Sequence, residues 1–169
     1  MKKMLAILLA VLFTAGALSP VSAETIPGFP ACLSTADMDG SPVDASIFAR
    51  ADVTVLHIWG TDCGPCIAEM PEIAAWISGL PENVQVIGLL TDVWSPDDRT
   101  FTLARKILEL AGADFVNLLN NDTLAPLTGM IVGTPTTFFL DSSGNLIGEP
   151  VLGAYTDKYR ETVDELLAR

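Results

Sequence analysis

The sequence predicts a single α/β domain with a central mixed β-sheet and helices on both faces. Nearly continuous apolar runs at residues 52–59 and 84–90 are typical of strands buried on both faces. Each run precedes a helical segment, an order that predicts parallel strands joined by right-handed crossovers. A chain of 169 residues is long enough for one such domain with a core, but not comfortably for two.

The N-terminal part of this domain predicts a β-hairpin followed by the first long strand. Residues 32–35 and 43–45 are short strand candidates on either side of a turn signal, DMDGSP, at residues 37–42. The first apolar run then forms a strand, and a helix is expected from about residue 63 to residue 78, ending near Gly79.

The remaining elements alternate in the same way. A second helix is expected after Ser95 as N-cap and Pro96 at the first helical position, and it should stop at Gly112. A short strand at 115–118 and a Pro-interrupted helix at 122–128 follow. Two strands then flank a DSSGN turn and form a hairpin, and an amphipathic helix carrying Tyr159 on its apolar face closes the chain; these segments are residues 136–140, 146–152 and 156–168.

The first residues predict export. Lys2 and Lys3 precede an apolar run at residues 4–18, and VSA at residues 21–23 fits a cleavage site after Ala23. An uncleaved anchor is the alternative, although the run is short for a membrane span of ~20 residues. We therefore expect a signal peptide at 1–23, an exported domain at 24–169, and a location in the periplasm or extracytoplasmic cell envelope.

The composition excludes some partners. Hydrophobic residues make up 50% of the chain and charged residues 18%, which is typical of a globular domain. The formal net charge is −12, and nucleic-acid binding depends on Lys and Arg that neutralise phosphates. We expect no nucleic-acid partner and no polybasic membrane-binding patch, and we interpret the acidity as a contribution to solubility.

Two of the three cysteines, Cys63 and Cys66, form a CxxC motif at the start of the expected helix. The helix N-terminus stabilises a thiolate on the first cysteine. A zinc site would need two more ligands, and only Cys32 and the mid-strand His57 remain. A purely structural disulfide would close too small a loop to add much stability. The spacing therefore favours a redox-active dithiol over these two alternatives.

The motifs around this dithiol resemble the thioredoxin superfamily, and within it the exported TlpA/ResA-like thiol–disulfide oxidoreductases. The segment WGTDCGPC looks like the WAxWCGPC segment of that family, and CIAEMP is similar to its CxxExP extension. GTPTTFFLDSSG looks like its G-x-P-T-T-F-x-x-D-x-x-G segment. The resemblance covers residues 28–168 and implies a thioredoxin-like fold for the domain at 24–169.

The resemblance also implies roles for individual residues. Cys63 is the exposed nucleophile, Cys66 is the resolving thiol, and the two form the Cys63–Cys66 disulfide when oxidised. Pro135 is expected to be cis and to turn Thr134 outward, so that its backbone can pair with a substrate strand. Trp59 is expected in the core beneath the site, and we also count it with Thr134 and Pro135 as a candidate substrate-binding residue.

Four further residues have open roles. Glu69 is expected beside Cys66, where the resemblance implies that it tunes the thiols; the alternative is a solvated helix acid. His57 lies six residues before Cys63, where it could accept the Cys66 proton or be a core histidine with one backbone hydrogen bond. Asp62 replaces the family's Trp and should oppose the Cys63 thiolate. Cys32 is expected to be an inert thiol or a partner in an intermolecular or regulatory disulfide.

The function implied by the resemblance is reduction of protein disulfides in the cell envelope, with cytochrome c maturation as one substrate class. We expect a monomer with no metal and no cofactor beyond its redox disulfide, kept reduced by a membrane thiol-electron transporter. One alternative is a peroxide-reducing redoxin, whose single peroxidatic cysteine in a Pro/Thr-rich loop is not seen. The other is a non-enzymatic copper-handling module, which would want a histidine downstream of the cysteines.

Overall fold

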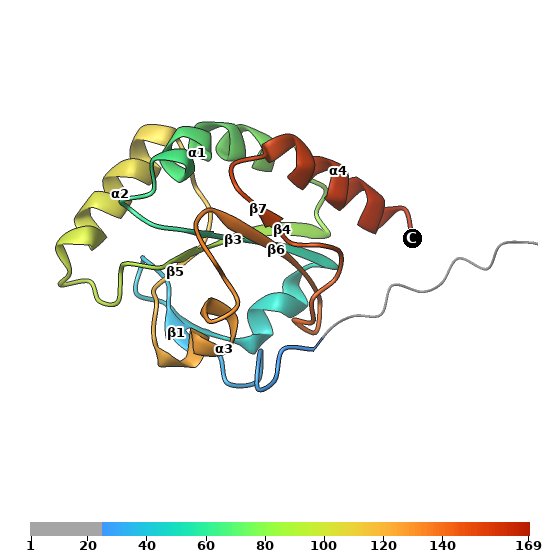
Figure 1. Cartoon of the computed structure of the whole chain (residues 1–169), viewed down its shortest axis with the longest axis horizontal. Helices are drawn as coiled ribbons and strands as arrows, with labels where there is room; N and C mark the ends of the chain where they lie inside the picture. The colour runs from blue at the N-terminus through green and yellow to red at the C-terminus, as the bar shows by residue number, and fades with distance from the viewer. Residues whose placement is uncertain (1–24) are drawn as a thin grey trace, which may run out of the picture.

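A computed structural model describes residues 25–169; the predicted signal peptide lies outside these residues. The chain forms a five-stranded sheet in the order β5-β4-β3-β6-β7 (Figure 1). The central strand β3 (Val53–Trp59) pairs in parallel with β4 (Val84–Leu90), which pairs in parallel with β5 (Asn117–Leu118). On its other side β3 pairs antiparallel with β6 (Thr136–Asp141), which pairs antiparallel with β7 (Val151–Leu152). The predicted mixed sheet is confirmed.

The three long helices lie on one face of this sheet. They are α1 (Gly64–Ile77), α2 (Arg99–Ala111) and α4 (Thr156–Leu167), and Figure 1 shows them together above the strands. The chain moves from β3 to β4 to β5 in one direction, so two right-handed crossovers place α1 and α2 on the same face. The opposite face is covered by the N-terminal segment and three short helices, η1 (Ala45–Arg50), η2 (Asp122–Leu124) and α3 (Ala125–Thr128).

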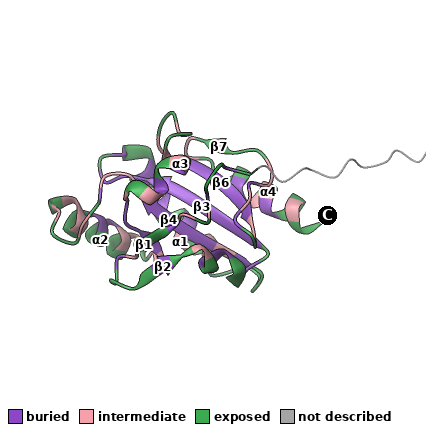
Figure 2. Cartoon of the chain, turned by 90° about the horizontal axis from the view of Figure 1, so that it is seen from below, coloured by how far each residue is buried: buried purple, intermediate pink, exposed green. Residues whose placement is uncertain are grey.

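The central strand separates two apolar layers. Every residue of β3 is buried, and Figure 2 shows the strands of the sheet interior as buried throughout. Because side chains alternate along a strand, Leu56 and Ile58 pack on the side of η1 and α3, whereas Val55 and Trp59 face the long helices. His57 shares this second face and is therefore directed toward α1 and α4.

The N-terminal hairpin is confirmed. Strands β1 (Ser34–Ala36) and β2 (Pro42–Asp44) pair antiparallel as a separate two-stranded sheet. The carboxylate of Asp37 accepts hydrogen bonds from the backbone N–H groups of Asp39 and Ser41, which closes the turn between the strands.

Two elements start more than two residues later than predicted. The helix expected after Ser95 begins instead at Arg99, because the Asp98 carboxylate accepts the N–H groups of Trp94 and Ser95 and holds this segment as a turn. The helix ends at Gly112 as predicted, with φ of 65°. The strand expected at 146–152 is reduced to β7 and one bridge between Leu140 and Leu146.

A close fit between β4 and β5 anchors the end of the central strand. The Trp59 indole N–H donates to Asn117 Oδ1 at 2.9 Å, and Asn117 Nδ2 donates to Phe115 O at 2.8 Å. Gly88 makes room for this amide, since a Cβ at position 88 would lie 1.9 Å from Asn117 Oδ1. The strand is thus fixed just before the loop that leads to Cys63. None of the helices within residues 25–169 is long and apolar enough to cross a membrane.

Candidate active site

The dithiol lies where β3 gives way to α1. Cys63 is the N-cap of α1, and its N–H donates to Gly60 O at 3.2 Å. Cys63 and Cys66 form a disulfide with an S–S distance of 1.99 Å and a Cα–Cα distance of 5.3 Å, as the resemblance implied. The Cys66 N–H donates to Cys63 Sγ at 3.2 Å, so the first turn of the helix directs a donor at this sulfur.

The two cysteines differ in accessibility. Cys63 keeps 7% of its surface exposed, whereas Cys66 is fully buried. Gly64 and Pro65 between them are exposed, and Pro65 stands in the first turn, where its missing N–H costs no helical hydrogen bond. Of the two residues only Cys63 has exposed surface, which supports the expected division into nucleophile and resolving thiol.

The loop before Cys63 is tied to the end of β4. The Asp92 carboxylate accepts the Thr61 N–H at 2.9 Å and also accepts the Thr61 hydroxyl. Asp62 between Thr61 and Cys63 is exposed. The loop is held through Thr61, while the Asp62 charge is left at the surface next to the nucleophile.

The Thr134–Pro135 peptide bond is cis, as predicted. Pro135 is buried and Thr134 is partly exposed. The following residue, Thr136, pairs with Ile58 near the end of β3, so this loop lies at the end of the sheet from which the dithiol emerges. The role of Thr134 and Pro135 in substrate binding stays a prediction.

The structure corrects one of the two roles predicted for Trp59. Its side chain is fully buried and its indole N–H is bonded to Asn117, so it has no surface with which to contact a substrate. The prediction that it lies in the core is confirmed, and its inclusion among the substrate-binding residues was wrong.

Glu69 is buried one turn beyond Cys66, at 6% exposure. Its Oε2 lies 3.1 Å from the Tyr159 hydroxyl, and its Oε1 lies 3.6 Å from His57 Nε2. Burial raises the pKa of Glu69 to about 7; the negative charge of Glu72 adds to this, and the Tyr159 hydrogen bond opposes it. The solvated alternative was wrong, and the carboxyl can gain or lose a proton near neutral pH.

His57 lies beneath the site with 1% exposure. Its Nδ1 lies 3.0 Å from Thr137 Oγ1, and its Nε2 faces Glu69. Burial lowers the pKa of His57 to about 4, so the imidazole is neutral at pH 7 and the contact with Glu69 is not an ion pair. Among residues 25–169, its hydrogen-bond partner is the Thr137 side chain rather than the backbone group of the core alternative, and Nε2 has none. The role of His57 as acceptor of the Cys66 proton stays a prediction.

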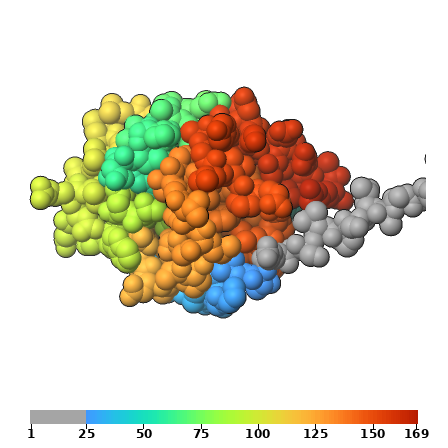
Figure 3. Space-filling view, in the orientation of Figure 1, coloured from blue at the N-terminus to red at the C-terminus, as the bar shows by residue number. Residues whose placement is uncertain are grey.

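Tyr159 completes this buried group and was missed from the sequence as a site residue. Its hydroxyl lies 2.8 Å from Gly153 O as well as 3.1 Å from Glu69 Oε2. Burial raises the pKa of Tyr159 to about 12, so the phenol keeps its proton. Figure 3 shows α4 packed directly beside α1, which brings this tyrosine to the carboxyl. The only signal was a phenol on an otherwise apolar helix face.

Comparison with known proteins assigns the family. The family model described as Redoxin matches residues 21–167. The chain belongs to the Redoxin family. No curated protein matches this redoxin.

Solved structures share its fold. MTB DsbF is 20% identical, with a TM-score of 0.66 over 84% of this redoxin and 99% of DsbF. StoA from Bacillus subtilis is 18% identical, with a TM-score of 0.62 over 81% of this chain and 99% of StoA. A secreted Mycobacterium tuberculosis disulfide oxidoreductase homologous to E. coli DsbE is 18% identical, with a TM-score of 0.62 over 80% and 97%. Family, fold and the Cys63–Cys66 disulfide together support thiol–disulfide oxidoreductase chemistry, as predicted.

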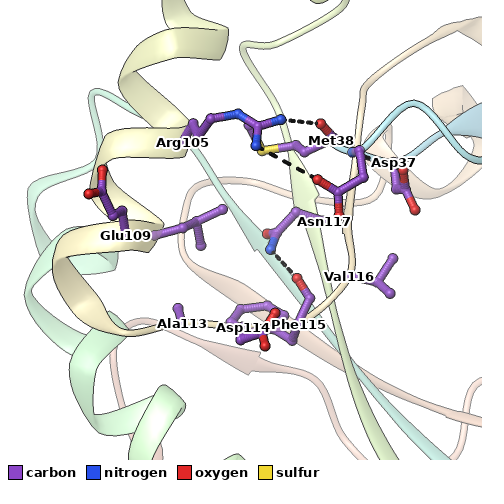
Figure 4. Close-up of a pocket in the computed structure, with 11 residues that line it drawn as sticks. Asp37, Met38, Arg105, Glu109, Ala113, Asp114, Phe115, Val116 and Asn117 are labelled. Carbon is purple, nitrogen blue, oxygen red and sulfur yellow. Dashed lines mark hydrogen bonds and ion pairs between the residues drawn. The ribbon is translucent and has the colours of Figure 1, made fainter.

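Two other features of this redoxin lie away from the dithiol. A pocket of about 550 Å³ lies between α2 and the segments around β1 and β5 (Figure 4). Arg105 spans it, donating to Met38 O at 2.6 Å and lying 3.7 Å from Asp39 Oδ1. Cys32 is partly buried and its thiol donates to Thr123 O at 3.2 Å, which fits the expectation of an inert thiol. Its part in an intermolecular or regulatory disulfide stays a prediction.

Proposed function

We propose that this redoxin reduces protein disulfides in the cell envelope through the Cys63–Cys66 dithiol. The observation that carries the proposal is a disulfide-bonded cysteine pair at a helix N-terminus, of which only Cys63 has exposed surface, with the Glu69 carboxyl buried one turn away and its pKa raised to about 7. A secreted protein with the same fold is described as a disulfide oxidoreductase, which supports the same chemistry here.

The geometry supports a two-step exchange. The Cys63 thiolate attacks one sulfur of a substrate disulfide, forming a mixed disulfide and expelling the other substrate sulfur as a thiolate. Cys66 then loses its proton, and its thiolate attacks Cys63 Sγ, which releases the second substrate sulfur and leaves the Cys63–Cys66 disulfide. Two electrons pass from the dithiol to the substrate. Ionised Glu69, next to Cys66 on α1, is the candidate acceptor for the Cys66 proton.

Two acids favour the reductive direction. Asp62 is exposed beside Cys63, and Glu69 is buried near Cys66. Negative charge near a dithiol disfavours its thiolate, and a pair whose reduced form is not specially stabilised is a weak oxidant. We therefore expect a reduction potential nearer to the ~−270 mV of thioredoxin than to the ~−120 mV of DsbA.

The biological setting is part of the same proposal. Residues 1–23 export the domain, and a membrane thiol-electron transporter returns it to the dithiol form. Thr134 and Pro135 present backbone to the substrate chain, and cytochrome c maturation is one process that needs such a reductant. The domain works as a monomer with no cofactor beyond its own disulfide.

Reduction of insulin disulfides tests the proposal. Residues 24–169 should catalyse it, Cys63→Ser should abolish it, and the control Cys32→Ser should retain it. No activity in the wild-type protein, or full activity in Cys63→Ser, would overturn the proposal. Faster turnover of hydrogen peroxide than of insulin would instead favour the peroxide-reducing alternative, and copper binding without reductase activity the copper-handling one.

Trapping tests the substrate class. Cys66→Ala removes the resolving thiol, so substrates should remain disulfide-linked to Cys63 in the native host. Recovery of exported proteins with paired cysteines is the expected result. Recovery of none would contradict a substrate-directed role.

A further inference from the structure

The Tyr159 hydroxyl lies between two hydrogen-bond acceptors. Gly153 O is 2.8 Å from it and Glu69 Oε2 is 3.1 Å from it, while the Tyr155 N–H points at the phenol oxygen from 3.4 Å. A phenol carries a single hydrogen and can donate it to only one acceptor at a time. The two short contacts can both be hydrogen bonds only if a second proton is present.

Glu69 is the group that can supply this second proton. When its carboxyl is protonated on Oε2, it donates to the phenol oxygen and the phenol donates to Gly153 O. When it is ionised, Oε2 draws the phenol hydrogen, because a hydrogen bond to a charged acceptor is the stronger one. His57 Nε2 faces Oε1 at 3.6 Å, beyond hydrogen-bond distance, and His57 Nδ1 lies 3.0 Å from Thr137 Oγ1. Among residues 25–169, Oε2 is therefore the carboxyl oxygen of Glu69 that has a hydrogen-bond partner.

Gly153 links the Tyr159 hydroxyl to the cis-proline loop, which lies at the end of the sheet from which the dithiol emerges. Its N–H donates to Pro135 O at 2.8 Å, so one residue bonds the cis-proline loop through its nitrogen and Tyr159 through its oxygen. Its φ of 102° lies in the region that favours glycine, and a Cβ there would meet the Tyr155 ring at 2.7 Å. A residue other than glycine at position 153 would therefore strain this junction between the two hydrogen bonds.

We propose that Tyr159 is a positioning residue whose single hydroxyl proton switches between Gly153 O and Glu69 Oε2, so that ionisation of Glu69 releases the Gly153 carbonyl next to the cis-proline loop. As a part of catalysis, this switch rests on the proposed disulfide reductase function. The proton that Glu69 exchanges during turnover then alters the hydrogen bonding of the segment that holds Pro135.

The groups around Glu69 determine the pH at which the Tyr159 hydroxyl changes its acceptor. His57 faces it from β3 and Tyr159 from α4, and Thr137 of β6 lies behind these two residues, next to both of them. Cys66 and Glu72 share its helix, and the Glu72 charge is partly balanced by Arg160 of α4 at 3.3 Å. Burial with these neighbours gives Glu69 a pKa of about 7, so the switch should operate near neutral pH.

The test is an NMR titration of the oxidised full-length protein. The carbonyl carbon of Gly153 and the amide nitrogen of Ala154 should titrate with the same midpoint, near pH 7, as the Glu69 carboxyl carbon. In Tyr159→Phe this response at residues 153 and 154 should vanish, and the Glu69 midpoint should rise by about one unit, because the carboxylate loses a donor. Tyr155→Phe, which removes an exposed hydroxyl on the same turn, is the matched control and should leave both responses unchanged.

A second variant keeps the proposal testable if Tyr159→Phe does not fold. Glu69→Gln should leave the Gly153 carbonyl without any response between pH 5 and pH 9. The proposal is overturned if that response persists in Glu69→Gln, or if Tyr159→Phe folds and keeps both the response and the wild-type midpoint. Since no substrate is present in these experiments, their outcome is independent of whether the protein reduces insulin.

Discussion

Two polar pairs are buried on the same face of β3, and they differ in one respect. Trp59 donates to Asn117 at 2.9 Å, and the amide of Asn117 has a second partner in the Phe115 carbonyl. Two residues earlier, His57 Nε2 and Glu69 Oε1 face each other at 3.6 Å, and within residues 25–169 neither atom has a hydrogen-bond partner. The Trp59–Asn117 pair has its hydrogen bonds formed and contains no group that titrates near neutral pH. The His57–Glu69 pair has unsatisfied atoms and contains a carboxyl that can gain or lose a proton.

This difference in hydrogen bonding distinguishes a contact that stabilises the fold from a contact that can take part in proton exchange. A satisfied neutral pair contributes by avoiding the cost of a buried unpaired donor. A pair with incomplete hydrogen bonding can change its protonation with little rearrangement, which is what a site that exchanges protons near neutral pH requires.

Asn117→Leu should cause the largest loss of stability. It leaves the Trp59 N–H unpaired in the core and places a branched side chain against Gly88, at a cost of about 2–3 kcal/mol in the free energy of unfolding. Urea denaturation measures this loss, and insulin reduction per folded molecule should be unchanged. Asn83→Leu at an exposed position is the control. Equal losses in the two variants would contradict a structural role for the Trp59 pair.

His57→Asn should make the free energy of unfolding depend more strongly on pH, because two opposing contributions partly cancel in the wild-type protein. The pKa of His57 is lowered from 6.5 to about 4, so between these values the unfolded chain binds more protons and stability rises with pH. The pKa of Glu69 is raised from 4.5 to about 7, so over that interval the folded chain binds more protons and stability falls with pH. The two trends oppose each other between pH 4.5 and 6.5.

Without His57 only the Glu69 trend remains. The stability of His57→Asn relative to the wild type should therefore fall with rising pH between 4.5 and 6.5, by up to about 1.4 kcal/mol per pH unit. Urea denaturation over a pH series measures it. A difference that stays constant over this range would show that the histidine does not titrate as inferred.

Glu69→Gln should have the opposite sign. Relative to the wild type, its stability should rise with pH between 4.5 and 7, because the wild-type protein must ionise a buried carboxyl there, again by at most about 1.4 kcal/mol per pH unit. Glu161→Gln, at an exposed site on α4, should give a flat difference. Resolution of the mixed disulfide should also slow in Glu69→Gln; an unchanged stopped-flow rate would remove Glu69 from the proton path.

Asp62→Asn should have the smallest effect. The Asp62 charge is exposed and screened, so its removal should increase the rate of Cys63 alkylation in the reduced protein by about two- to fivefold at pH 7. Iodoacetamide kinetics at low salt measure this rate. Asp97→Asn is a control at another exposed acid, and an equal increase in both variants would mean that position 62 has no specific influence.

The sequence was sufficient for the parts of the site that depend on local spacing. The disulfide at the helix start and the placement of Glu69 one turn beyond Cys66 were expected from that spacing, whereas the cis bond before Pro135 was expected from the family resemblance. Tyr159 and Thr137 were not expected as partners, because they lie 90 and 80 residues from Glu69 and His57 and meet them only through the packing of α4 and β6. The second helix was placed too early because the Asp98 carboxylate bonds preceding N–H groups.

The unequal exposure of the two sulfurs has a kinetic consequence. Any protein that donates electrons to the oxidised pair and any protein that withdraws them from the reduced pair must approach the same atom, Cys63 Sγ, since Cys66 is fully buried. The electron donor and the electron acceptor therefore compete for Cys63 Sγ and cannot both react with it at the same time. Turnover should follow a ping-pong order, with parallel double-reciprocal plots for donor and acceptor.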